Sequence, residues 1–298
     1  MTLLSSHALA TSNINKTNLG EDGNTYVLDR HHAFLKGSKS CEAKDPGSFR
    51  VIVQGFSLFT GVKMNISGAV VDTLANLPLS KRSLLEENDF GTRVNQIDLE
   101  LNGKKIEVCL VVSEVLWDLA AANLISIIKD FKPDFVLMSG RGGKTATLET
   151  GARNQSGTLA GYNYDGTYSG NLNRPRSKRV DPRYKSSKII PATWNFESIY
   201  TAINPEIKKL GFKLKLGKEG RSDNDYICNN IHYSILQSVL EGDVELAGGL
   251  LRPLLALEAF PAMGFFHYPS GTLNKDPKAE LEAWSKVVLN IIKAQLNI

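Results

Sequence analysis

The order of short apolar runs and longer amphipathic stretches constrains the fold of this 298-residue chain most strongly. Apolar runs of strand length occur at 50–54, 106–112, 134–138, 212–216 and 262–267. Apolar residues recur every three to four positions, as on one buried helical face, at 67–78, 115–130, 195–209, 228–241 and 277–296. Strands that alternate with helices usually pair in parallel. The sequence therefore predicts an α/β fold, a three-layer α/β/α arrangement with a mostly parallel twisted sheet.

The composition favours one globular enzyme domain with additions. The chain is 42% hydrophobic and 22% charged, as in soluble proteins, and no apolar run is long enough to cross a bilayer. Residues 1–49 are polar and end in a loop-like KDPGS, so we predict a loop-rich N-terminal extension. The main domain is predicted at 50–298, with insertions near 155–188 and 242–262.

Three cysteines, Cys41, Cys109 and Cys228, are too few and too scattered to predict a disulfide framework or a cysteine zinc site. Cys109 lies within the apolar strand IEVCLVV. This usage favours a reducing compartment. The N-terminus shows no basic segment before an apolar core, so we expect a cytoplasmic protein.

Cys228 is the candidate nucleophile. The stretch SDNDYICNN, residues 222–230, brings it to the start of an amphipathic helix after a run of turn-forming residues. Unpaired backbone N–H groups and the positive end of the helix dipole favour a thiolate there, and the same groups can hold an oxyanion. The alternative is that Cys228 is a small buried hydrophobe, the usual role of a free cysteine.

A thiolate that cleaves an amide needs an imidazole to carry the proton, and a third group to orient that imidazole. Three of the five histidines lie in polar N-terminal segments: His7, His31 and His32. His232 follows Cys228 by one helical turn, and we expect it to face solvent or a neighbouring element. His267 ends an apolar run and reads as the carboxyl end of a buried strand, where α/β proteins place their chemistry. Glu149, after the glycine-rich turn SGRGG, is the candidate third group, although a glutamate after a loop more often begins a helix.

Four motifs in order carry a family resemblance. They are GFSLFTGVKMNIS at 55–67, PDFVLMSGRGGKTATLETGARN at 133–154, SDNDYICNNIHY at 222–233 and GFFHYP at 264–269. In these segments the chain resembles pyroglutamyl peptidase type I, the pyrrolidone-carboxylate peptidase family of cysteine exopeptidases. The resemblance implies a cofactor-independent, metal-free thiol peptidase that removes an N-terminal pyroglutamyl residue from peptides. It implies Cys228 as nucleophile, His267 as general base and then acid, and Glu149 as the group that orients the imidazole.

The resemblance also implies a pocket for the flat lactam ring. Its residues would be Phe56, Phe59, Asn65, Tyr226 and Ile227. The three aromatic rings would sandwich the lactam, main-chain groups near Ile227 and in the glycine turn would bind its amide, and Asn65 would add a polar contact. Aromatic faces suit a neutral planar ring, but Phe56 and Phe59 could equally be ordinary core residues. Expected partners are pyroglutamyl peptides and further copies of the chain, not nucleic acid or membrane.

Several residues depart from the family pattern. Leu58 and Ile66 replace prolines, Asn224 and Asp225 replace a Gly-Thr pair, and Lys144 replaces an arginine. Asp225 would either raise the pKa of the nearby thiol or cap the helix, and we favour the cap. The departures leave two alternatives open: a thiol amidase or peptidase for a different N-terminal group, and an idle binding protein on the same scaffold.

The segment 174–188 gathers seven Lys or Arg residues. Such a run in a loop is more often solvated than bound to an anionic partner, and it contributes much of the net charge of +4. Because this segment follows Glu149 closely in sequence, it could lie over the active site.

Overall fold

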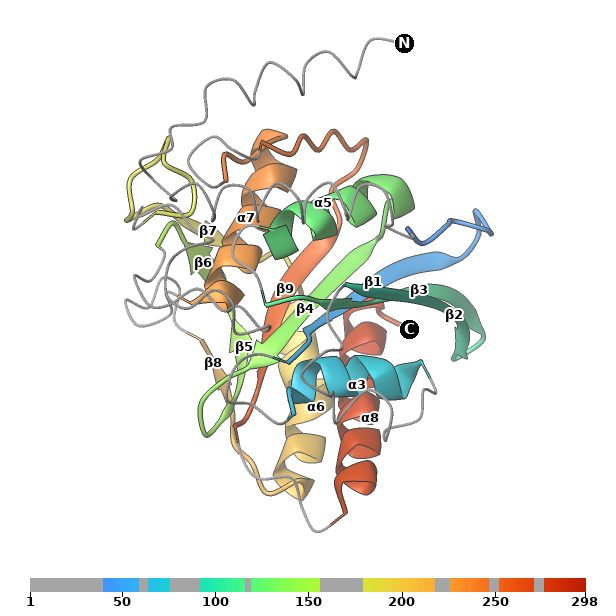
Figure 1. Ribbon diagram of the computed structural model, residues 1–298. Helices are drawn as coiled ribbons and strands as arrows, with labels where there is room; N and C mark the ends of the chain where they lie inside the picture. Colours follow the sequence, from blue (N-terminus) through green and yellow to red (C-terminus); the bar gives the residue numbers. More distant parts are fainter. Residues whose placement is uncertain are drawn as a thin grey trace.

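The computed structural model describes residues 40–58, 64–75, 92–115, 119–155, 179–217, 226–246, 252–270 and 276–298. Within these residues a seven-stranded sheet lies between two layers of helices (Figure 1). The strands of the main sheet are β1 (Phe49–Phe56), β2 (Arg93–Leu101), β3 (Lys104–Ser113), β4 (Phe135–Arg141), β5 (Ala146–Glu149), β8 (Leu214–Leu216) and β9 (Ala262–Tyr268). A separate pair consists of β6 (Gly151–Arg153) and β7 (Ile189–Pro191). The helices are α3 (Ile66–Leu74), α5 (Leu119–Phe131), α6 (Phe196–Lys209), α7 (Ile227–Glu241) and α8 (Pro277–Leu296).

The strand order is β2-β3-β1-β4-β9-β5-β8. Neighbours from β3 to β9 pair in parallel, as do β5 and β8. Within the described part of the main sheet, two pairings are antiparallel: β2 with β3 at the edge, and β5 with β9 inside the sheet. The predicted α/β fold with a mostly parallel sheet is confirmed.

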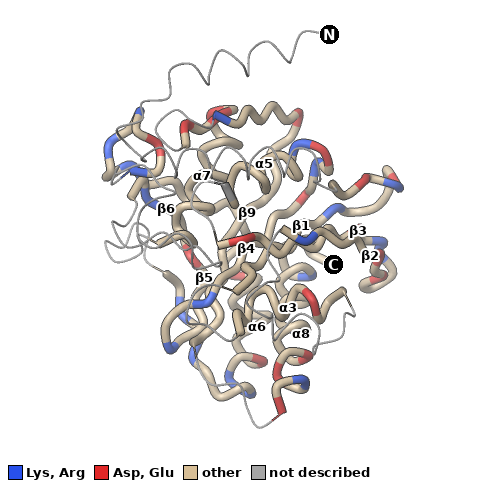
Figure 2. Tube along the Cα trace, in the orientation of Figure 1, with Lys and Arg blue, Asp and Glu red and all other residues tan. Residues whose placement is uncertain are grey.

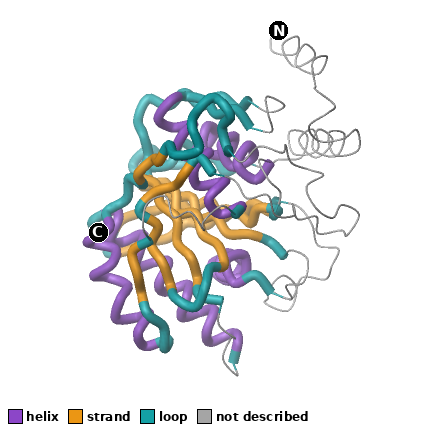
Figure 3. Tube along the Cα trace, turned by 90° about the vertical axis from the view of Figure 1, so that its left-hand side faces the viewer, coloured by secondary structure: helices purple, strands orange, loops and turns teal. Residues whose placement is uncertain are grey.

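Helices cover both faces of this sheet. In Figure 1, α5 and α7 lie on one side, and α3, α6 and α8 lie on the other. Each layer encloses its own apolar cluster, because side chains alternate between the two faces along every strand. Figure 2 shows the charged residues mainly on loops, helices and the strands β2 and β3, and the central strands β4 and β9 almost without them. Figure 3 shows the strands side by side between the two layers.

All five predicted strands and all five predicted helices are present in the described residues, with ends shifted by a few positions. One shift is at α3, which ends at Leu74 and not near residue 78. The sequence reading missed β2, β5, β6 and β7. β2, RVNQIDLEL, is an edge strand with mixed polar residues, and the other three have only three or four residues each. Such segments carry too little apolar pattern to be recognised.

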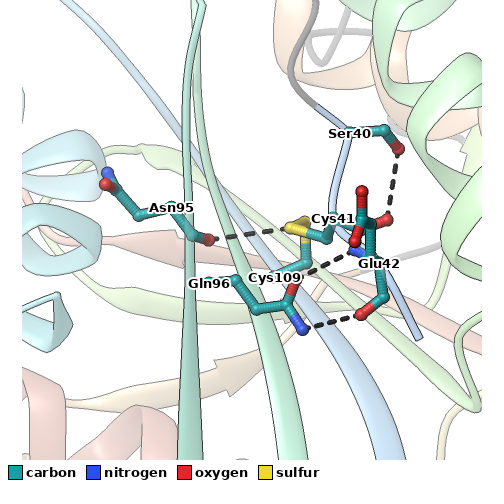
Figure 4. Close-up of a disulfide and its surroundings, with 6 residues drawn as sticks. All are labelled: Ser40, Cys41, Glu42, Asn95, Gln96 and Cys109. Atoms are coloured by element: carbon teal, nitrogen blue, oxygen red, sulfur yellow. Dashed lines mark hydrogen bonds between the residues drawn. A yellow bond between two sulfur atoms is a disulfide. The ribbon is translucent and has the colours of Figure 1, made fainter. Parts of the chain in front are cut away.

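The number and scatter of the cysteines did not predict a disulfide framework, but the structure contains one disulfide. Cys41 bonds to Cys109 of β3, with the Cα atoms 5.7 Å apart and a sequence separation of 68 (Figure 4). The same segment is bound to the sheet by polar contacts: Gln96 pairs with the main chain of Glu42, and the Glu107 carboxylate accepts from the N–H groups of Lys44 and Asp45. Spacing along the chain could not reveal this pairing, because tertiary structure brings Cys41, in the segment before β1, next to Cys109 of β3.

The described part of the basic segment, 179–188, is bound to the protein, whereas we expected a solvated loop. Arg183 forms ion pairs with Asp181 and Asp243, both at 2.7 Å, and Lys188 pairs with Glu241 at the end of α7. Asp181 is fully buried. Residues 156–178 lie outside the described residues, so the predicted position over the active site is not tested there.

Candidate active site

The predicted nucleophile, base and orienting group come together at the carboxyl ends of the central strands. His267 is the second-last residue of β9, and it lies opposite Gly140 of β4 on one side and Thr147 of β5 on the other. Glu149 is the last residue of β5, so it ends a strand and does not begin a helix. Cys228 is the second residue of α7.

The imidazole of His267 is held by the carboxylate. Its Nδ1 lies 2.9 Å from Oε1 of Glu149, and both side chains are largely buried. The other ring nitrogen is left for the thiol, and His267 also hydrogen-bonds Cys228. Burial alone would lower the pKa of His267, but its hydrogen bonds and electrostatic interactions with Cys228 and Glu149 outweigh the effect of burial and raise the pKa to about 10. The imidazole is therefore protonated at neutral pH.

The start of α7 presents Cys228 as the sequence predicted, in the first helical turn. The N-cap position belongs to Tyr226, whose side chain makes no capping hydrogen bond, and the first turn contains no acidic residue. Asp225, for which we favoured a capping role, lies outside the described residues. The first backbone N–H groups of a helix have no partner within the helix, so they are suited to bind an anion.

Three glycines leave room for these side chains. A Cβ at Gly140 would lie 2.7 Å from the Cys228 sulfur, and one at Gly142 would lie 2.8 Å from Cβ of His267. A Cβ at Gly217 would lie 2.3 Å from Oε2 of Glu149. Sequence reasoning singled out the turn at 139–143 but missed Gly217, which follows β8 and carries no local signal.

The predicted lactam-binding residues have mixed placements. Phe56 ends β1, and it shares an apolar cluster with Ile227 and Cys228, against which Tyr226 is partly buried. The first three are buried. These residues thus lie on the α5 and α7 side of the sheet, with the nucleophile. Phe59 and Asn224 lie in segments 59–63 and 218–225, which are outside the described residues.

Asn65 has a structural role that the sequence reading did not assign. It is the N-cap of α3: its Oδ1 accepts from the N–H and the hydroxyl of Ser67, and its Nδ2 donates to the carbonyl of Ser57 at 2.9 Å. The departures Leu58 and Ile66 are both buried near this loop. A contact from Asn65 to substrate would have to use its remaining N–H.

His232 faces the neighbouring strand β9, the second of the two expected alternatives, and not solvent. It is 1% exposed, and its ring lies 5.6 Å from the ring of Phe265, which in turn lies 4.8 Å from that of His267. Burial, with a smaller contribution from the charge of His267, lowers the pKa of His232 to about 3. His232 is therefore neutral, and its Nε2 has no hydrogen-bond partner among the described residues.

The described residues contain no group of three or more His, Cys, Asp or Glu side chains arranged to hold a metal ion. In the same part of the chain, no helix has both the length and the apolar character needed to span a membrane.

No family model matches the sequence. Among curated proteins, a catalase-peroxidase of Escherichia coli is 25% identical over 212 residues, which are 68% of this chain and 26% of that protein. A catalase-peroxidase 2 of Escherichia coli O157:H7 gives the same values. The chain thus spans about a quarter of the length of the curated relatives it matches.

Solved structures resemble the fold more fully. The pyroglutamyl peptidase I of Bacillus amyloliquefaciens aligns with a TM-score of 0.50 and 18% identity, over 83% of this chain and 96% of that one. A mutant pyrrolidone carboxyl peptidase of Pyrococcus furiosus aligns with a TM-score of 0.53 and 15% identity, over 84% of this chain and 99% of that one. At this identity the likeness establishes a shared fold.

Proposed function

We propose that the chain is a cysteine exopeptidase that removes an N-terminal pyroglutamyl residue from peptides. The observation that carries the proposal is the connected arrangement of Cys228, His267 and Glu149 on three different elements of this fold. The fold is related to that of pyroglutamyl peptidase I, and the four sequence motifs supply the substrate class.

The mechanism begins with a thiolate and an imidazolium. A protonated His267 beside Cys228 supplies a nucleophile and a proton donor together. The sulfur attacks the exocyclic carbonyl carbon of the pyroglutamyl residue, and the carbonyl becomes a tetrahedral oxyanion. Backbone N–H groups at the start of α7 stabilise this charge.

His267 then donates its proton to the departing amine, and the C–N bond breaks to leave a thioester on Cys228. The neutral imidazole next accepts a proton from water, whose oxygen attacks the thioester carbonyl. Collapse of this second intermediate breaks the C–S bond and releases pyroglutamate. Glu149 holds Nδ1 throughout, which keeps the other ring nitrogen directed at the reaction.

The neutral lactam ring suits the apolar surroundings of the thiol. Phe56 and Ile227 belong to the cluster that contains Cys228, with Tyr226 partly buried against it. An apolar site excludes a charged α-amino group, because burying an unpaired charge is costly. The apolar surroundings of the thiol therefore favour a pyroglutamyl ring, in which the nitrogen is a neutral amide, over a residue with a charged α-amino group.

The test is hydrolysis of pyroglutamyl-aminomethylcoumarin by the purified chain, beside Cys228→Ala. We expect cysteine-dependent release of the fluorophore, and full turnover by Cys228→Ala would reject the mechanism. Prolyl and glutamyl amides test the alternative of a different N-terminal group. Failure of Cys228 to react with iodoacetamide at neutral pH would favour the idle scaffold.

The disulfide bears on where this enzyme works. A bond such as Cys41–Cys109 persists in oxidising compartments and is rare in the cytosol. It therefore favours an oxidising compartment over the cytoplasmic location that the cysteine usage predicted.

A further inference from the structure

The residue after the nucleophile binds the main chain of a distant segment. The Oδ1 of Asn229 accepts from the N–H of Arg153 at 3.0 Å. Its Nδ2 donates to the carbonyls of Arg153 at 2.8 Å and Gln155 at 2.7 Å. Asn229 is 2% exposed, so water cannot easily replace these three bonds.

The bound segment begins four residues after the orienting carboxylate. Arg153 is the last residue of β6, which follows β5 with only Thr150 between them, and Glu149 ends β5. Asn229 therefore joins the start of α7 to the chain that carries Glu149. The segment that contains Arg153 is also fixed from its other side. The buried side chain of Asn154 forms hydrogen bonds with the main chain of residues 181, 184 and 185.

The contacts form a closed circuit through the candidate active site. Glu149 holds His267, and His267 hydrogen-bonds Cys228. Cys228 is adjacent to Asn229 in sequence, and Asn229 is bound to Arg153, from which the chain leads back to Glu149. The nucleophile and the orienting group are 79 residues apart in sequence, and within this circuit Asn229 supplies the side-chain bonds that fix helix α7 against β6.

We propose that Asn229 is a positioning residue that sets the location of the Cys228 sulfur relative to the His267–Glu149 pair. The proposal rests on the proposed function, since it assigns Asn229 a role in that reaction. The side chain acts through Cys228 and needs no contact with substrate. Misplacement of a reacting group by about 1 Å can cost about 10²-fold in rate, so loss of these bonds should be seen in kcat.

The test compares Asn229→Leu, which removes all three bonds at similar volume, with Val239→Ala. Val239 is buried in the same helix three turns away, so its truncation destabilises α7 without touching the Asn229 contacts. For each protein, one measures thermal stability, the pH profile of Cys228 alkylation by iodoacetamide, and kcat and KM for pyroglutamyl-aminomethylcoumarin.

We expect Asn229→Leu to slow alkylation at neutral pH by about 10-fold or more, to move its pH profile, and to lower kcat by about 10²-fold with KM changed less than about 3-fold. Val239→Ala should keep the alkylation profile of the unaltered protein. A less stable Asn229→Leu with an unaltered alkylation profile would overturn the proposal, since Asn229 would then be merely structural.

If Asn229→Leu does not fold, Asn229→Asp decides, because it keeps the acceptor for the N–H of Arg153 and loses the amide donors. The same shift in alkylation is expected, and an unaltered profile would again reject the role. Absence of hydrolysis by the unaltered protein, with a reactive Cys228 whose profile moves on substitution, would reject the pyroglutamyl substrate and leave Asn229 as a positioning residue.

Discussion

Glu149 and His267 lie diagonally across the antiparallel pair β5 and β9, with His267 opposite Thr147 and Glu149 opposite Phe265. A displacement of two positions places both side chains on the same face of the sheet, where the Nδ1 to Oε1 distance is 2.9 Å. In a mostly parallel sheet, the antiparallel pairing of β5 with β9 brings the carboxylate to the imidazole.

The first prediction concerns Glu149→Gln. The neutral amide removes a negative charge from His267, so the pKa of His267 should fall from its raised value of about 10. The imidazolium is then lost at lower pH, and the alkaline limb of the kcat/KM profile should move to lower pH. We expect kcat to fall by at least about 10-fold, because the ring also loses its fixed orientation.

The measurement is the pH dependence of hydrolysis from pH 5 to 11, with Glu280→Gln as the control. Glu280 is a buried glutamate in α8, on the opposite face of the sheet from α7. An alkaline limb that stays in place in Glu149→Gln would mean that the carboxylate does not hold the proton on His267.

Gly140→Ala tests the space beside the nucleophile. The added methyl would meet the Cys228 sulfur at 2.7 Å and the ring of Phe265 at 3.1 Å, so the sulfur must move. We expect a loss of about 10²-fold in kcat with the fold retained. Gly143→Ala is the matched control in the same turn, because nothing lies within 4 Å of its added methyl. Equal activity of the two variants would contradict the tight contact at Gly140.

His232→Phe tests whether burial keeps the His232 imidazole neutral in the folded protein. The pKa of His232 is lowered to about 3 by burial and by His267, against an ordinary value of 6.5. A group that is neutral in the folded state but protonated on unfolding contributes stability above pH 6.5 and loses it as the pH falls from 6.5 towards 3. The free energy of unfolding falls by about 1.4 kcal/mol for each pH unit below 6.5.

Phenylalanine has a similar size, and it would keep the contact with the ring of Phe265. When the pH is lowered from 7 to 5, the unaltered protein should therefore lose about 2 kcal/mol more unfolding free energy than His232→Phe does. Urea unfolding at the two pH values measures this difference. An unchanged difference between the proteins would show that His232 titrates normally and is not held neutral.

His267 should act on stability in the opposite direction. Its folded pKa of about 10 lies above the ordinary 6.5, so its contribution is present below pH 6.5 and is lost as the pH rises through 10. Unfolding of His267→Gln between pH 6 and 10 checks this, because the variant should lose less stability over that range than the unaltered protein. A parallel decline in both proteins would contradict the raised pKa.

The sequence predicted the elements whose apolar spacing is local. The five strands and five helices follow from periodicity, and the start of α8 follows from Asp276 and Pro277: the carboxylate of Asp276 accepts from the N–H groups of Lys278 and Ala279. Cys228 and His267 could be chosen because each lies next to the end of such an element: Cys228 in the first turn of α7, and His267 one residue before the end of β9.

Residues that act across the fold gave no such signal. Gly217 and Asn229 owe their roles to segments 68 and 76 residues away, Glu149 and Arg153. The reversed strand β5 has four residues, and its pairing with β9 is fixed by tertiary structure. A single sequence shows composition and spacing, and it does not show which distant backbone a buried amide will bind.

The last prediction concerns the Cys41–Cys109 bond. It closes a loop of 68 residues, so its removal should free the unfolded chain and lower the free energy of unfolding by about 2–5 kcal/mol. The double variant Cys41→Ser, Cys109→Ala should unfold at lower urea than the oxidised protein, and equally with or without reductant. Cys228→Ser is the control, because it keeps the disulfide and removes the free thiol.

Intact mass after alkylation of the unfolded, unreduced protein should show one modified cysteine. Three modified cysteines in protein made in an oxidising compartment would contradict the bond, and the cytoplasmic location predicted from the sequence would then be favoured again.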